Sequence, residues 1–379
     1  MKKILYVTTI GTTINSFLVP HIEMLCDKGY KVDCACFIDK PIDERLIKKS
    51  VEVFDIPFTR NPLDIRNIKA FKNLIRIQKE NNYDIIHVHT PVASVYGRLL
   101  KIKFPNLKTI YTAHGFHFYK GAPKKNWIIF YTIEKIMSGL TDILITMNKE
   151  DYQVAINKFN AKKVFNINGV GVDLEKYKCS EEIDLEMKSE LGLSNDDIVI
   201  TVIAELSHRK NQKQLIYAVQ NLINEYKNLK VLLVGEGELK DKFNNYILEN
   251  SLEENIKLLG FRRDIKKILG VTDIVGLFSY HEGLPRNLME AMVAKKPIIC
   301  TDIRGNNDLI QNGINGILVE VDNIEQTKYA IRNLYNDKNK RKVMGQKSFE
   351  IVKRKYSLEN VLSQINNIYS FDEEVKQWD

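Results

Sequence analysis

Cysteine is scarce in this chain of 379 residues, and its spacing excludes one class of site. The five cysteines form no Cys-x-x-Cys pair and no Cys/His group with the spacing of zinc ligands. An odd number of cysteines without such spacing fits a reducing cytoplasm. We therefore expect buried, unreactive thiols at Cys26, Cys34, Cys36, Cys179 and Cys300.

Long hydrophobic runs are also absent. No segment reaches the ~18 to 20 consecutive apolar residues of a membrane-spanning helix, and the most apolar stretches, 143–147 and 274–278, have the length of a strand. The first residues, MKKILYVTTIGTT, resemble a secretory signal, but their apolar part is short and no small-x-small cleavage site follows. We predict a first β-strand there and a chain that does not span a bilayer.

Charge is distributed unevenly along the chain. Residues 1–180 carry 28 Lys/Arg against 17 Asp/Glu, whereas residues 181–379 carry 28 against 31. The basic first half indicates an anionic partner, such as membrane phospholipid, a polyprenyl phosphate or nucleic acid. Nucleic acid is the weakest of these options because no recognition motif accompanies the charge.

Strand-length apolar runs alternate with helix-length amphipathic segments, which is typical of parallel sheets covered by helices on both faces. The first half has six expected strands: 3–9, 31–37, 85–89, 108–112, 143–146 and 164–167. The second half has six more: 198–203, 230–234, 256–259, 274–277, 297–300 and 316–319. After residue 322 only helices are expected.

The alternation breaks at residues 168–194, where glycines and a polar stretch indicate a linker. We expect a Rossmann-like domain at 1–170, a second one at 171–355, and a C-terminal helix at 356–379 that returns to the first domain. Two doubly wound sheets of this kind bind ligands at the carboxyl ends of their strands, so we expect the site in a cleft between the two domains.

The most informative stretch is HEGLPRNLMEAMVAKKPIICTD, at 281–302. It follows an apolar strand, so Gly283 and Pro285 are expected to open a helix whose free N–H groups suit a diphosphate. Glu282 stands just before this helix and Glu290 about two turns into it, where both carboxylates could accept hydrogen bonds from sugar hydroxyls. Alternatively, Glu282 only complements the helix dipole and Glu290 lies on a solvated face.

Two other loops follow expected strands. Segment 204–219, AELSHRKNQKQLIYAV, places Arg209 and Lys210 at the sheet edge, either as ligands of an anion or as solvated cations at a helix start. His114 follows the strand that ends near Thr112, and its neighbour Gly115 lets the backbone bend. His87 and His89 lie on a strand and are expected to be core or strand-end residues.

The Glu, seven residues, Glu arrangement with Gly-Leu-Pro after the first Glu resembles the signature of the family 4 retaining glycosyltransferases of the GT-B fold. The resemblance extends over nearly the whole chain. The segment HGFHFYKG most resembles the branch of the family that assembles bacterial capsules and exopolysaccharides. The other matching segments are YTAHGFHFYKGAPKKNW (111–127), DILITMNKED (142–151), GVGVD (169–173), RKN (209–211), LLVGEGELK (232–240) and LLGFRRDI (258–265).

The resemblance implies roles for several residues. Glu290 would bind the nucleotide ribose, and Glu282 and His114 the transferred sugar. Lys210 would be the family's phosphate lysine, whereas Glu205 stands where the family commonly has an arginine, so that Arg209 takes over or donor binding differs. The other residues expected to bind the donor have these places. Gly283, Leu284 and Pro285 would contact the diphosphate, and Gly235 would line the cleft. Arg262 lies in the loop expected to read the nucleobase, and Gly11 lies in the first loop of the chain.

No Asp-x-Asp occurs in the chain, and glycosyltransferases that hold diphosphate through a divalent metal usually have one. The likeness therefore implies a metal-independent enzyme with no cofactor, in which Lys210, Arg209 and the helix start neutralise the leaving diphosphate. The expected donor is a nucleotide sugar, most simply UDP-linked.

The expected acceptor is a lipid-linked saccharide, because the acceptor half of such enzymes is the basic half here. Segment 116–131 mixes aromatics with lysines, and segment 64–80 places Ile65, Ile68, Phe71, Leu74 and Ile75 on one helical stripe. These features indicate attachment to an anionic membrane surface from the cytoplasmic side. A small soluble acceptor, or a non-catalytic protein that binds nucleotide sugars, are the alternatives.

Overall fold

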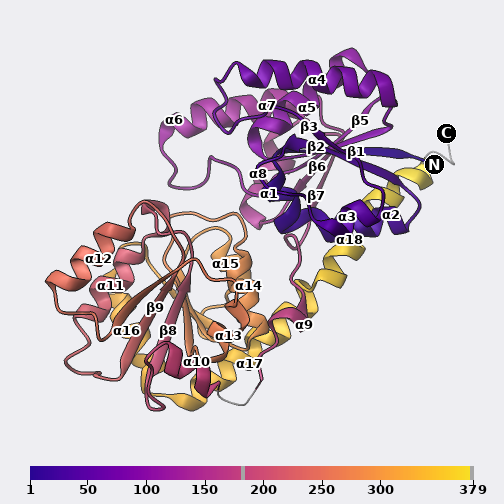
Figure 1. The fold of residues 1–379 in the computed structure, drawn as a ribbon. Coiled ribbons are helices and arrows are strands. Elements are labelled where there is room, and N and C mark those ends of the chain that lie inside the picture. Colours follow the sequence, from indigo (N-terminus) through magenta and orange to yellow (C-terminus); the bar gives the residue numbers. More distant parts are fainter. Residues whose placement is uncertain (181–183, 376–379) are drawn as a thin grey trace. The chain divides into compact units, whose positions relative to one another are not determined.

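The computed structural model describes residues 1–180 and 184–375. The described chain divides into two compact units, one formed by Met1–Val170 with the segment from Val361 onward, the other by Gly171–Asn360. Each unit contains one fully parallel sheet with helices packed against it (Figure 1). Positions 181–183 of the expected linker and 376–379 of the expected C-terminal helix lie outside the described residues.

The first unit is built on a seven-stranded sheet in the order β3-β2-β1-β4-β5-β6-β7. The strands are apolar and mostly buried along their length because helices cover both faces of a parallel sheet. Their bounds are β1 Lys3–Ile10, β2 Lys31–Phe37, β3 Val53–Asp55, β4 Ile85–His89, β5 Lys108–Thr112, β6 Ile143–Thr146 and β7 Lys163–Asn166.

Ten helical segments belong to this part of the chain. The π-helical segments η1 and η2 each continue an α-helix on both sides. Their bounds are α1 Gly11–Thr13, η1 Ile14–Leu18, α2 Val19–Asp27, α3 Glu44–Lys48, α4 Arg66–Asn81, α5 Pro91–Lys103, α6 Lys124–Asn126, η2 Trp127–Tyr131, α7 Thr132–Ser138 and α8 Lys149–Lys158.

The second unit has a six-stranded parallel sheet in the order β10-β9-β8-β11-β12-β13. The order reverses at β8, so the loops after β8 and β11 leave the sheet at its topological switch point, where open α/β sheets bind ligands. The strands are β8 Ile198–Ile203, β9 Leu229–Val234, β10 Ile256–Gly260, β11 Ile274–Leu277, β12 Ile298–Thr301 and β13 Gly316–Val319.

Helices of the second unit surround this sheet (Figure 1). They are α9 Leu174–Tyr177, α10 Leu185–Glu190, η3 His208–Lys210, α11 Gln212–Gln220, α12 Lys240–Glu249, α13 Ile265–Gly270, α14 Arg286–Val293, α15 Asn306–Leu309, α16 Ile324–Tyr335 and α17 Lys338–Lys355. The long helix α18, Leu358–Val375, begins in this unit and continues into the first, where the Tyr369 hydroxyl lies 2.7 Å from His87 Nδ1.

The predicted α/β architecture of two Rossmann-like sheets is confirmed. Two expectations were wrong in detail. The first sheet has a seventh strand, β3, whose three residues are too few to show a pattern. The apolar stripe of segment 64–80 is divided: Leu74 is buried, but Ile65 precedes the first turn of α4 and is 80% exposed, and Ile68 is also exposed.

Candidate functional site

The loops after β8 and β11 meet at one carboxylate in the second unit. The Nζ atom of Lys210 lies 2.6 Å from Glu282 Oε1, and Arg209 Nη1 lies 3.2 Å from the same oxygen. The two loops come together because β8 and β11 are hydrogen-bonded neighbours in the parallel sheet. The structure thus joins the adjacent Arg209 and Lys210 to Glu282, which lies 73 and 72 positions further along the sequence.

Glu282 is buried, with 8% of its surface exposed, and its two carboxylate oxygens differ. Oε1 also accepts a hydrogen bond from Ser279 Oγ at 2.7 Å, whereas Oε2 accepts none from the described part of the chain. Burial alone would raise the pKa of Glu282, but the charges of Lys210 and Arg209 outweigh it and lower this pKa below its ordinary value. The carboxylate is therefore ionised at neutral pH, with one oxygen available to a ligand.

Burial has the opposite effect on the cation of this pair. It lowers the pKa of Lys210, and the nearby Glu282 charge offsets only part of that effect. The Arg209 side chain is more exposed, and its Nη1 also donates to the carbonyl of His281. An anion that bound here would contact the side chains of Lys210 and Arg209, which share Glu282 as their only carboxylate partner among the described residues.

A second layer holds the Glu282 backbone in place, and sequence reasoning missed it. The buried Arg304 donates from Nε to the Glu282 carbonyl at 3.0 Å. Gly305 has φ +84°, and a Cβ there would lie 2.6 Å from the Gly283 carbonyl oxygen, so this close approach requires glycine. The only signal for this role in the sequence is the position of Arg304 just after the strand β12.

Glu290 lies on α14, which starts at Arg286 after the extended Pro285. The helix begins later than expected, so Glu290 is about one turn from its start, not two. Its carboxylate pairs with Arg286 Nε at 3.3 Å and forms a hydrogen bond with the side chain of Tyr177. Burial raises the pKa of Glu290, although Arg286 and Tyr177 oppose this.

The residues around Glu290 show why the start of α14 suits an anion. The chain bends at Gly283 and Leu284 and is extended at the buried Pro285, so the N–H groups in the first turn of α14 have no carbonyl of a preceding turn to pair with, although the N–H of Leu288 donates to Asn287 Oδ1. Gly283 precedes them and packs against Gly305. The expected contacts of Gly283, Leu284 and Pro285 with a diphosphate remain predictions.

Gly235 acts on the site through packing. A Cβ at Gly235 would lie 2.0 Å from the carbonyl oxygen of Ala204, and one at Gly237 would lie 2.3 Å from that of Leu206. These two glycines therefore let the loop after β9 pack against the loop that carries Arg209 and Lys210. The expected contact of Gly235 with a ligand stays a prediction.

The Arg262 side chain forms ion pairs with two carboxylates. Its guanidinium lies 2.6 Å from Asp264 and 2.8 Å from Glu190, so it holds α10 against the loop after β10. Phe261, beside it, is 70% exposed. The predicted approach of this loop to a nucleobase therefore depends on backbone atoms and on Phe261 more than on the paired Arg262 side chain.

Two expected site residues lie in the first unit. His114 is half-buried after β5, and its Nε2 lies 3.1 Å from His89 Nδ1. Burial lowers the pKa of His114 to about 4, so its imidazole is neutral at pH 7. Gly11 is buried after β1, where a Cβ would lie 3.2 Å from Ile42, so its place is explained by packing.

Comparisons with known proteins identify the family of the chain. Residues 184–350 match the family model "Glycosyl transferases group 1" and residues 3–148 match "Glycosyl transferase 4-like". The chain is 32% identical over 373 residues to a putative glycosyltransferase, EpsD, of Bacillus subtilis, covering 97% of this chain and 96% of the relative. The chain belongs to the group 1 glycosyltransferases.

Two further comparisons extend the picture. A UDP-Gal:alpha-D-GlcNAc-diphosphoundecaprenol alpha-1,3-galactosyltransferase of Escherichia coli is 29% identical over 324 residues, covering 84% of this chain and 83% of that protein. The crystal structure of Anabaena HepE in complex with UDP-glucose aligns with a TM-score of 0.82 at 20% identity, covering 98% of this chain and 100% of that one. The fold of this group 1 glycosyltransferase is therefore GT-B.

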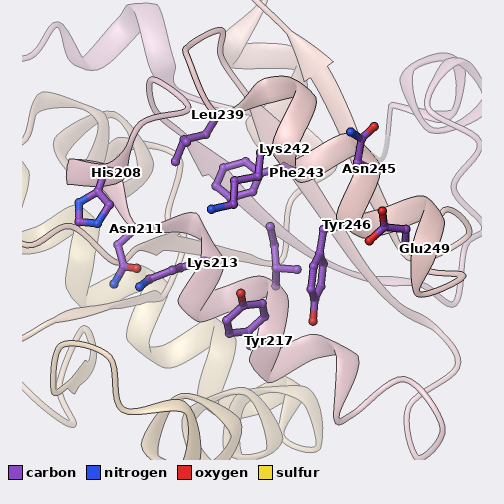
Figure 2. A pocket seen from close by; sticks show the side chains of 11 residues that line it. His208, Asn211, Lys213, Tyr217, Leu239, Lys242, Phe243, Asn245, Tyr246 and Glu249 are labelled. Carbon is purple, nitrogen blue, oxygen red and sulfur yellow. The ribbon is translucent and has the colours of Figure 1, made fainter.

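One cavity of this glycosyltransferase lies beside the candidate site. It measures about 610 Å³ and is lined chiefly by α11 and α12, with side chains of Lys213, Tyr217, Phe243 and Tyr246 (Figure 2). It approaches the site only through His208 and Asn211, and neither Glu282 nor Glu290 lines it. The candidate site is therefore the Glu282 cluster and not this cavity.

Proposed function

We propose that this chain is a retaining glycosyltransferase that moves a sugar from a UDP-linked donor to a membrane-anchored polyprenyl-diphosphate saccharide in polysaccharide biosynthesis. The observation that carries the proposal is the contact of Lys210 Nζ with Glu282 Oε1 at 2.6 Å, with Arg209 on the same oxygen. The activity of the Escherichia coli relative, a UDP-Gal:alpha-D-GlcNAc-diphosphoundecaprenol alpha-1,3-galactosyltransferase, supports both the donor nucleotide and the acceptor class. The UDP-glucose in the crystal structure of Anabaena HepE supports the same kind of donor.

The two cations supply what the leaving group needs. When the bond between the sugar C1 and the β-phosphate oxygen breaks, negative charge develops on that oxygen. In this proposal Lys210 and Arg209 neutralise it, and backbone N–H groups at the start of α14 add hydrogen bonds to the diphosphate. Side chains would thus do the work that a divalent metal does in other glycosyltransferases.

The carboxylates orient the donor in this proposal. The Oε2 atom of Glu282 accepts a hydrogen bond from a hydroxyl of the transferred sugar, while its Oε1 pairs with Lys210 and Arg209. Glu290 binds the ribose. The acceptor oxygen bonds to C1 on the face that the diphosphate leaves, and the acceptor proton passes to the departing β-phosphate oxygen. The anomeric configuration is then retained.

The first test is a ligand screen followed by transfer. UDP-sugars at about 100 times their Kd should stabilise the protein by about 2.7 kcal/mol, since only the folded state binds them. We therefore expect a rise in melting temperature of about 5 °C or more, with smaller rises for GDP- and ADP-sugars. The stabilising donor should then transfer its sugar to a polyprenyl-diphosphate saccharide, with retention measured by NMR. A panel in which no nucleotide sugar raises the melting temperature would contradict the proposal.

A basic and apolar surface supports the membrane-anchored acceptor. On the continuous helix formed by α6, η2 and α7, Ile128 is 71% exposed and Ile136 is 66% exposed. Lys124 and Lys125 are exposed at the start of the same helix. Apolar side chains next to lysines suit the headgroup region of an anionic membrane. In the described chain no helix is both long and apolar enough to cross a membrane.

Vesicle sedimentation tests this surface. We expect the protein to sediment with vesicles of phosphatidylcholine and 30% phosphatidylglycerol, and about tenfold less with phosphatidylcholine alone, because the lysines need anionic headgroups. Ile128→Glu should strongly reduce binding to the anionic vesicles. Val343→Glu, which changes a position in the other unit that is 51% exposed, should not. Equal binding by both variants would remove this surface from the proposal. Sugar transfer by a protein that does not bind anionic vesicles would favour the alternative of a small soluble acceptor.

A further inference from the structure

A pair of histidines lies at the carboxyl ends of two neighbouring strands of the first unit. His89 is the last residue of β4 and His114 follows β5, and their Nδ1 and Nε2 atoms are 3.1 Å apart. The buried His89 ring packs against Tyr6, with ring centroids 5.4 Å apart, and against His87, at 4.3 Å, and these two rings also contact each other at 4.7 Å. His89 therefore has a fixed orientation, and His114 contacts it from the more exposed side.

The backbone next to His89 is strained, which independently marks this strand end. Thr90 has φ +63°, an unfavourable value for a β-branched residue. Its hydroxyl lies 2.7 Å from the Thr9 hydroxyl and accepts the Thr9 N–H at 3.0 Å, so the end of β1 holds Thr90 in place. Strain of this kind persists where the surrounding structure enforces it, and it is concentrated at functional sites.

The unpartnered nitrogen of His89 decides which ring nitrogens carry protons. His89 Nε2 is buried and has no hydrogen-bond partner in the described chain. A proton there would be an unsatisfied buried donor, which is rare and costs more than an unused lone pair. The proton of His89 therefore belongs on Nδ1, from which it is donated to His114 Nε2. His114 then accepts at Nε2 and carries its own proton on Nδ1.

We propose that His89 is a positioning residue that holds His114 in the Nδ1–H tautomer, so that the outer face of His114 presents a hydrogen-bond donor to an oxygen of the sugar or phosphate of the donor. This inference rests on the proposed function for its ligand but not for its tautomer. Among the described residues His114 Nδ1 has no partner, which leaves that donor for a ligand. A neutral donor suits a sugar hydroxyl or a phosphate without requiring a buried charge.

The surroundings keep this pair neutral. The titratable groups that face it are His21 from α2, His87 from β4 and Tyr6 from β1, and Tyr369 from α18 contacts His87 behind them. Burial lowers the pKa of His89 well below its ordinary value and that of His114 to about 4. The pair should therefore keep its tautomers from pH 5.5 to 8, across the range in which an ordinary histidine titrates.

Nitrogen NMR on the protein with ¹⁵N-labelled histidine tests the tautomer without any substrate. Signals of His114 are identified by their loss in His114→Gln. We expect the pattern of a neutral ring protonated on Nδ1, unchanged between pH 5.5 and 8. In His89→Leu, which removes the donor, His114 should shift to the Nε2–H tautomer. A wild-type His114 protonated on Nε2, or a tautomer unchanged in His89→Leu, would overturn the proposal even if sugar transfer is observed.

Matched amide variants then test the effect on transfer. Asparagine at position 89 places an N–H near the position of the histidine Nδ1, whereas glutamine places it near Nε2, away from His114. We expect His89→Gln and His89→Leu to lower kcat by about tenfold to a hundredfold with little change in the donor KM, and His89→Asn to recover most of the loss. Equal losses in all three variants, with unchanged melting temperatures, would assign His89 a role other than positioning. Absence of transfer by the wild type would refute the proposed function and leave the NMR result standing.

Discussion

Replacing Lys210 with methionine is expected to lower kcat for sugar transfer by about a hundredfold to a thousandfold, the usual effect of removing one group that stabilises charge in a transition state. Methionine keeps the unbranched side chain that packs beside Glu282 but removes the ammonium 2.6 Å from its Oε1. Because charge on the β-phosphate develops as the bond to C1 breaks, the loss should fall on kcat more than on KM. Steady-state kinetics with the donor identified by the ligand screen would measure it.

Lys213→Met is the matched control. This lysine lies three residues further along the same segment, and its Nζ approaches Asp322 only to 3.9 Å, outside the Glu282 cluster. It should keep the parental rate. Since Lys210→Met leaves Glu282 buried with Arg209 and Ser279 as its remaining donors, melting temperatures must be compared as well. A Lys210→Met protein that folds and transfers sugar within threefold of the parent would defeat the assignment of this cluster.

The fold was largely predictable because its signals are local. Buried runs such as IVITVI, the strand β8, are bounded by polar loops, so most predicted strand ends lie within one residue of the observed ones. The strand β3 escaped prediction because three residues carry no periodicity, and it is recognisable only through its pairing with β2. The position of Ile65 outside α4 was likewise not evident, because an apolar stripe does not say where a helix begins.

The site was predictable only in its motif residues. The family signature pointed to Glu282 and Lys210, but their contact depends on β8 and β11 being neighbours. Arg304 supports the backbone of Glu282 from 22 positions away, and no local pattern indicates this. Likewise His89 was expected only to be a core or strand-end residue. That its buried Nε2 has no partner among the described residues becomes evident only when β4 and β5 are placed side by side.

Exchanging the two glutamates for glutamine should separate the two ends of the donor. Glu290→Gln is expected to raise the donor KM by about tenfold to a hundredfold, because a charged acceptor of ribose hydroxyls is worth about 1.5 to 3 kcal/mol. Free UDP contains the same ribose, so its Kd should rise by the same factor. Glu282→Gln should instead leave the Kd of UDP within about threefold and lower kcat, because its Oε2 is assigned to the transferred sugar, which UDP lacks.

Isothermal titration with UDP and kinetics with the UDP-sugar measure both effects. Glu325→Gln, which removes the same charge from the exposed first turn of α16, is the control and should change neither quantity. The Tyr177→Phe variant adds a graded step, since it removes a hydrogen bond to Glu290 while keeping the carboxylate, and should raise the Kd of UDP less than Glu290→Gln does. If Glu282→Gln raises the Kd of UDP as much as Glu290→Gln does, the assignment of Glu282 to the transferred sugar and of Glu290 to the ribose is wrong. The different environments of Glu282, which is paired with two cations, and Glu290, which is held by Arg286 and Tyr177, argue for that assignment.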